Sequence, residues 1–133
     1  MPNARTAAMS VANFELRSVE WTPAKAALVV STLVTAAIHL ALATTAGDNV
    51  FAVLGLGLLV GFVAFFTDLW EPVLYLVGAV YVGITTAVWV LAGMPQPLLG
   101  AADKVVQAVL LVLFVYVLVR EVRAGEADED VGT

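Results

Sequence analysis

Residues 26–67 read AALVVSTLVTAAIHLALATTAGDNVFAVLGLGLLVGFVAFFT, and Asp48 is the single charged side chain among them. Two apolar runs flank the Gly47-Asp48 pair, and each approaches the roughly 20 residues that an α-helix needs to cross a bilayer. Strands of a transmembrane barrel are only about 9–11 residues long and alternate in polarity, which this stretch does not. The stretch therefore predicts two consecutive membrane-spanning helices joined by a tight turn.

The C-terminal half of the chain repeats this pattern. Residues 72–102 carry no charge but are interrupted by Gly93-Met94-Pro95-Gln96-Pro97, and residues 105–119 are almost wholly aliphatic. The last helix has two possible starts, because Asp103 and Lys104 either lie in its first turns or precede it. We predict four spanning helices, over residues 23–44, 50–66, 72–91 and 98–119.

Capping signals stand at the expected helix ends, namely Thr22-Pro23, Gly47-Asp48, Glu71-Pro72 and Pro97. The connections are short, at about residues 46–49, 68–71 and 92–97, so sequential helices must run antiparallel. The predicted fold class is all-α, an integral membrane up-down four-helix bundle. Connections this short leave no room for a catalytic domain outside the membrane.

Composition supports the membrane assignment and excludes several kinds of chemistry. The chain is 62% hydrophobic and 13% charged, with a mean hydropathy of +0.99, whereas soluble domains are about 45–50% apolar and about 25% charged. Because there is no cysteine and only one histidine, His39, disulfides, thiolate metal sites and a bis-histidine haem within one chain are excluded. We expect no cofactor and no metal, and without a basic patch we expect no nucleic-acid partner.

Basic residues at both ends predict the orientation. Arg5, Arg17 and Lys25 precede the first span, Arg120 and Arg123 follow the last, and the short connections carry few basic residues. Because lysine and arginine are enriched on the cytoplasmic side, both termini are expected in the cytoplasm of a multi-pass cell-membrane protein.

The two terminal segments lie outside the predicted bundle. Residues 1–22 have only a weak helical face, so an interfacial helix and a disordered segment are both compatible with them. Because they include acidic residues, the first span is expected to be a retained helix rather than a signal peptide. Residues 120–133 hold the main acidic block, Glu126, Asp128, Glu129 and Asp130, which predicts a disordered cytoplasmic tail.

His39 is the most informative single residue. An ionisable side chain within a membrane helix suggests a functional site, and histidine changes charge at near-physiological pH. Ser31, Thr35 and His39 are four residues apart, so they share a face of the first predicted helix, expected to point inward. The alternative is a neutral imidazole that bonds a neighbouring helix or reaches the outer interface.

Other polar residues are expected at the same depth, near the outer leaflet. Asp103, Lys104 and Gln107 lie in the first turns of the fourth predicted helix, and Thr85, Thr86 and Trp89 on the third. With Thr35 and His39 these side chains could form a polar cluster in which His39 approaches Asp103 or Gln107. In the alternative interpretation, Asp103 and Lys104 only cap the fourth helix and extend toward water.

Glycines suggest how the helices pack. Gly57 and Gly61 form a small-xxx-small pattern in the second predicted helix, which allows the close approach of another helix within the bundle or in a dimer. Gly78 and Gly83 could act in the same way on the third. No serine–histidine–aspartate set, phosphate-binding loop or pair of intramembrane carboxylates can be identified, so we expect no enzymatic activity.

The chain resembles small four-span membrane proteins of haloarchaeal type. Its only lysines are Lys25 and Lys104, it is rich in alanine, valine and glycine, and residues 126–130 read EADED, as is typical of proteins from high-salt cytoplasms. The resemblance lies in composition and layout without a diagnostic motif. It implies a four-helix membrane architecture and assigns no functional residue.

Two functions fit these features. The first is a non-enzymatic accessory or structural subunit that packs laterally in the bilayer with itself or with a larger membrane complex. The second is a homo-oligomeric small transporter or channel with a proton- or ion-linked site around His39. The absence of polar side chains from residues 50–66 favours the first, because a pore or carrier needs a continuous polar path.

Overall fold

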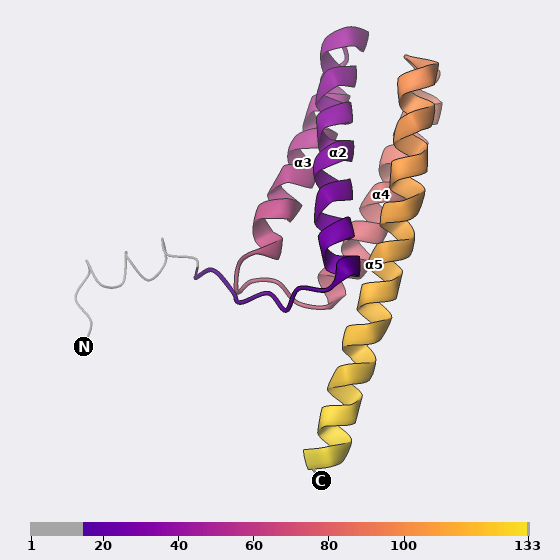
Figure 1. Cartoon of the computed structure of the whole chain (residues 1–133). Coiled ribbons are helices and arrows are strands. Elements are labelled where there is room, and N and C mark those ends of the chain that lie inside the picture. Colours follow the sequence, from indigo (N-terminus) through magenta and orange to yellow (C-terminus); the bar gives the residue numbers. More distant parts are fainter. Residues whose placement is uncertain (1–14, 133) are drawn as a thin grey trace, which may run out of the picture.

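A computed structural model describes residues 15–132, with side-chain surroundings up to Asp128, and it is built from four helices (Figure 1). Outside these helices, the described residues pair as β-structure only at one isolated bridge. The prediction of an all-α fold is confirmed. The helices are α2 (Pro23–Ala46), α3 (Asn49–Phe65), α4 (Val73–Leu91) and α5 (Pro97–Gly132).

Three of the helices are long and apolar enough to cross a membrane, namely α2, α4 and the portion of α5 from Pro97 to Asp128. The remaining helix, α3, is apolar after Asn49 but has only 17 residues. The structure thus supports a membrane protein with at least three candidate spans.

Local chemistry explains where the first two helices begin and end. The Thr22 hydroxyl accepts a hydrogen bond from the backbone N–H of Lys25 at the start of α2, and Gly47 ends that helix in the left-handed region at φ 65°, where glycine has no side-chain clash. The Asp48 carboxylate then accepts from the backbone N–H of Val50 at 2.9 Å and caps α3. The two helices are consequently joined by a turn of only two residues.

The prediction for the C-terminal tail is wrong for the residues described. Instead of ending near Val119 in a disordered segment, α5 continues as a helix through Gly132, and it extends past the other helices (Figure 1). Apart from Gly125, residues 120–127 contain no helix-breaking residue, and alanine, glutamate and arginine are strong helix formers. Acidic composition alone therefore did not distinguish a solvated helix from a disordered segment.

Part of the N-terminal segment adopts a structure that the sequence did not predict. Residues 15–22 form no helix, and an antiparallel bridge joins Leu16 to Thr67 in the α3–α4 connection. The backbone N–H of Arg17 donates to the Phe66 carbonyl at 2.9 Å, and that of Asp68 donates to the Glu15 carbonyl at 3.0 Å. An interfacial helix is therefore excluded for these residues, while residues 1–14 lie outside the part of the chain described.

The helices form an up-down bundle that is open on one side. The pairs α2–α3, α2–α5 and α4–α5 pack closely, whereas α3 and α4 do not, although they are consecutive in the chain. The inner face of α5 repeats every three or four residues, as in coiled coils: Gly100, Asp103, Gln107, Leu110, Phe114 and Val117. The last three belong to an apolar core that also contains Leu28 of α2 and Tyr75 of α4.

We refer to the two ends of the bundle by their contents. The terminal end contains residues 15–22, the α3–α4 connection and the exit of α5 (Figure 1). The loop end contains the α2–α3 turn and the α4–α5 connection. This distinction places the polar groups described below, which gather at both ends.

Candidate functional site

A polar cluster lies inside the bundle near the loop end, where α2, α4 and α5 meet. Each helix contributes from its inward stripe: Thr35 and His39 are one turn apart on α2, as are Asp103 and Gln107 on α5. Thr35, His39, Thr85 and Asp103 are all 0% exposed, and Gln107 is 2% exposed. Buried polar groups are costly unless they are hydrogen-bonded, so the internal bonding of the cluster decides whether it is tolerated.

Asp103 links α5 to α2. Its Oδ1 accepts a hydrogen bond from the Thr35 hydroxyl at 2.6 Å, a short distance that is characteristic of a charged acceptor. Its Oδ2 lies 3.7 Å from Nδ1 of His39 and 3.5 Å from Nζ of Lys104. The carboxylate therefore lies between a titratable imidazole and an ammonium group.

The contacts of His39 indicate which ring nitrogen carries the proton. Nδ1 lies 2.8 Å from the backbone carbonyl oxygen of Thr35, and because a carbonyl oxygen can only accept, Nδ1 must be the donor. The neutral ring then presents Nε2 as an acceptor, and this atom is buried without a hydrogen-bond partner. The ring centroid of Phe51 on α3 lies 6.3 Å from that of His39, so α3 covers the histidine with an apolar side chain.

Gln107 connects all three helices. Its Nε2 donates to the Thr85 hydroxyl of α4 at 2.9 Å and to the Thr35 hydroxyl of α2 at 3.3 Å. Its Oε1 accepts from the Thr86 hydroxyl at 2.9 Å and from Nζ of Lys104 at 2.8 Å. Both amide donors and the amide oxygen are thus engaged, which fixes the side-chain orientation.

Lys104 and Trp89 close the cluster toward the loop end. Nζ of Lys104 lies 5.3 Å from the centre of the Trp89 ring, within the range of a cation–π interaction. The indole N–H of Trp89 donates to the Pro95 carbonyl at 3.0 Å. The ammonium group therefore balances the buried carboxylate, while the Lys104 side chain as a whole remains 19% exposed.

This arrangement is suited to holding helices together and to placing a titratable group in the interior. Hydrogen bonds across apolar helices are a recognised source of association in membranes, at about 0.6 kcal/mol on average. Within the residues described, no three histidine, aspartate or glutamate side chains gather as a metal site would require. The ammonium of Lys104 already lies beside the Asp103 carboxylate, where a bound metal cation would have to lie.

The structure brings together the residues that the sequence suggested for this site: His39, Thr35, Thr85, Trp89, Asp103 and Gln107. It also decides between the two starts of the last helix. Because α5 begins at Pro97, Asp103 and Lys104 lie in its second turn and do not act as caps. Ser31 is only partly buried, and Thr32 takes its place on the inward face of α2.

The predicted glycine contacts differ from one another. Gly57 lies directly under the Tyr81 hydroxyl, so it makes room for a side chain of α4, although the two helices do not pack closely. A methyl group built on Gly61 would meet nothing within 4 Å, and the same is true of Gly83. The close approach of α3 to α2 depends instead on Gly55, whose added Cβ would lie 3.2 Å from the Ala36 carbonyl oxygen.

A second polar cluster at the terminal end was not predicted. Nζ of Lys25 lies 2.9 Å from Oε1 of Glu121, and the same oxygen accepts from the Tyr75 hydroxyl at 3.2 Å. The sequence does contain a signal for it, because Glu121 continues the three-four repeat of the inner face of α5 beyond Val117. Lys25 lies one turn before the buried Leu28, so its position in the helix also indicates the inward face of α2.

No family model matches the chain, and neither a curated protein nor a solved structure matches it.

Proposed function

We propose that this chain is a non-enzymatic, multi-pass membrane protein that packs laterally in the bilayer as an accessory or structural subunit, with itself or with a larger complex. It crosses the cell membrane four times, and both termini lie in the cytoplasm. The observation that carries the proposal is the arrangement of polar and apolar side chains. Polar groups inside the bundle bind one another, while apolar faces of α3 and α4 point outward.

The crossing of α3 is the critical step in this topology. At about 1.5 Å per residue, its 17 residues extend about 26 Å, somewhat less than the roughly 30 Å hydrocarbon core. A bilayer adapts to a short span by local thinning at modest cost. The turn of two residues at Gly47-Asp48 reverses the chain at once, so α3 returns alongside α2 and reaches the opposite surface.

The exposed face of α3 supports a lateral role. Among the described helices, α3 packs closely against α2 alone. Its outward stripe is Val53, Leu56, Val60 and Val63, each more than half exposed. Between apolar helices in lipid there is no hydrophobic driving force, so association depends on close fit. A stripe of mostly β-branched valines suits this, because such side chains have little rotamer freedom to lose.

A cysteine crosslinking experiment tests this role. Because the chain has no cysteine, Val60→Cys introduces a unique thiol on the outward face of α3. In membranes, we expect oxidation or a short bis-maleimide to join two copies through Val60→Cys, or to join one copy to a native partner. The matched control is Val112→Cys on α5, which is 65% exposed compared with 69% for Val60 and should remain uncrosslinked.

Equal crosslinking at the two positions would indicate random collision and would contradict the proposal. A chain that remains a lone monomer in mild detergent and in membranes would contradict it as well. A crosslinked product that contains a second polypeptide would favour the larger complex over self-association.

One observation favours a second function, a proton- or ion-linked carrier. Nε2 of His39 is a buried acceptor without a partner, and Asp103 lies next to the other ring nitrogen. An imidazole placed in this way could take up a proton from the loop end. Flux through reconstituted protein that depends on pH and is abolished by His39→Ala would favour the carrier over the accessory role.

A further inference from the structure

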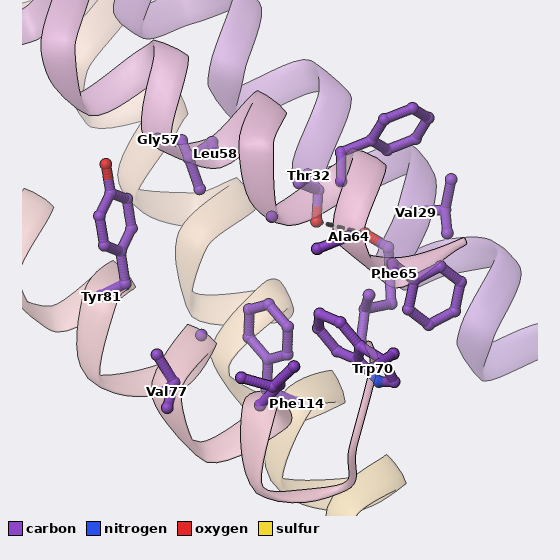
Figure 2. Close-up of a pocket in the computed structure, with 15 residues that line it drawn as sticks. Val29, Thr32, Gly57, Leu58, Ala64, Phe65, Trp70, Val77, Tyr81 and Phe114 are labelled. Atoms are coloured by element: carbon purple, nitrogen blue, oxygen red, sulfur yellow. Dashed lines mark hydrogen bonds between the residues drawn. The ribbon is translucent and has the colours of Figure 1, made fainter. Parts of the chain in front are cut away.

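A cleft of about 170 Å³ lies between α3 and α4 at the side where the bundle is open (Figure 2). Leu58 and Phe65 of α3 line one wall and Val77 of α4 the other, while α2 and α5 contribute Leu28 and Phe114. Val77 is 55% exposed, so the cleft communicates with the surroundings of the bundle. In a membrane, those surroundings are lipid chains.

The hydroxyl groups in the cleft wall are already bonded to the backbone. The Thr32 hydroxyl donates to the Leu28 carbonyl at 2.8 Å, and the Tyr81 hydroxyl donates to the Leu54 carbonyl at 2.7 Å. An apolar cavity of this size does not hold ordered water and accepts apolar molecules. The lining of the cleft therefore favours an apolar ligand such as a hydrocarbon chain.

Small residues create the space. Gly61 faces the cleft, and a Cβ added there would meet no atom within 4 Å. Tyr81 bridges from α4 to α3 toward one end of the cleft, whereas Phe65 and Trp70 lie at the other (Figure 2). The cleft is thus a short groove. We call the end formed by Phe65 and Trp70 the aromatic end, and it lies at the terminal end of the bundle.

Two hydrogen-bond donors without partners lie beside the aromatic end. The guanidinium carbon of Arg17 lies 4.5 Å from the centre of the Phe65 ring, and the Trp70 ring centroid lies 5.2 Å from that of Phe65. Nη2 of Arg17 and Nε1 of Trp70 are both buried without an acceptor. Among the described residues, Arg17 forms no ion pair.

We infer that this groove binds one anionic phospholipid, with a hydrocarbon chain between α3 and α4 and the phosphate near Arg17 and Trp70. A phosphate oxygen supplies what these donors lack, and arginine binds phosphate with particular strength. Arg17, Trp70 and the Phe65 end of the groove then lie at the same membrane surface, the one at the terminal end of the bundle. The inference rests on the membrane placement under the proposed function, and it does not depend on self-association.

Native mass spectrometry of the full chain in mild detergent tests the inference, with phosphatidylglycerol and phosphatidylcholine of identical chains as probes. We expect one phosphatidylglycerol per chain, bound in preference to phosphatidylcholine. Gly61→Phe fills the groove and should weaken binding of both lipids by about tenfold or more, where tenfold corresponds to about 1.4 kcal/mol. The matched control Gly83→Phe, at an equally unobstructed glycine on the exposed side of α4, should bind as the wild type does.

Arg17→Gln leaves the groove intact. It therefore separates the contribution of the lipid headgroup to binding from that of the hydrocarbon chain. We expect it to remove the preference for phosphatidylglycerol while retention of phosphatidylcholine persists. Unchanged binding by Gly61→Phe, or no preference in the wild type, would overturn the inference, as would a second polypeptide found in the groove. The same spectra report the oligomeric state. A monomer that still binds lipid would contradict the proposed lateral packing and leave the lipid-binding inference standing.

Discussion

Asp103→Asn is expected to destabilise the bundle by about 3 kcal/mol, the lower end of the range of about 3–5 kcal/mol for breaking a buried ion pair. Asparagine retains an oxygen for the Thr35 hydroxyl, but it removes the charge that lies 3.5 Å from Nζ of Lys104. The ammonium then lacks an anion in an apolar setting. Because Lys104 is 19% exposed, it can partly reach water, which is why the lower end applies.

The double variant Asp103→Asn, Lys104→Gln provides the control. It removes both charges and should recover part of the loss, since coupled neighbours typically interact by about 0.5–3 kcal/mol. Reversible unfolding in mixed micelles with increasing dodecyl sulfate, followed by circular dichroism, measures both variants. A double variant that is no more stable than Asp103→Asn would show that the pair contributes nothing as a pair.

Gly100→Ala is expected to destabilise the loop end, although alanine is the better helix former. An added Cβ would overlap ring atoms of Trp89, and the indole cannot move away freely because its N–H binds the Pro95 carbonyl. Overpacking of this kind costs about 1–3 kcal/mol, compared with about 1 kcal/mol gained from helix propensity. We therefore expect a net loss together with a change in tryptophan emission as the indole leaves its acceptor.

The matched control is Gly83→Ala on α4, where a Cβ meets nothing within 4 Å. That variant should be neutral or slightly stabilised and should leave the emission unchanged. If the two variants unfold at the same detergent concentration, Trp89 does not pack against Gly100 as described.

The fold could be predicted largely from charge-free runs and capping residues. Thr22, Gly47 and Asp48 act through local geometry, which a sequence displays directly, so the ends of the first two helices follow from it. The open side of the bundle could not be predicted in this way, because Tyr81 and Gly57 are far apart in sequence and meet only through packing. The helical C-terminal segment does not follow from its acidic composition, because a solvated helix and a disordered segment can share that composition.

Much of the candidate site could be predicted from register. Thr35 with His39 and Asp103 with Gln107 are each four residues apart, which places each pair on one inward face and at one depth. The roles within the site could not be predicted. The central position of Gln107 depends on the rotation of three helices about their axes, and the bridge from Lys25 to Glu121 joins residues near opposite ends of the chain.

The proposed topology has four crossings with both termini on one side, and α3 is the shortest of the helices concerned. Single cysteines at exposed positions of the cysteine-free chain report this directly: Ala46→Cys, Asp68→Cys, Ala92→Cys and Ala124→Cys. A membrane-impermeant maleimide applied to intact cells should label positions 46 and 92, and positions 68 and 124 should react only after permeabilisation. Labelling of positions 46 and 68 from the same side would show that α3 does not cross, and would contradict the account.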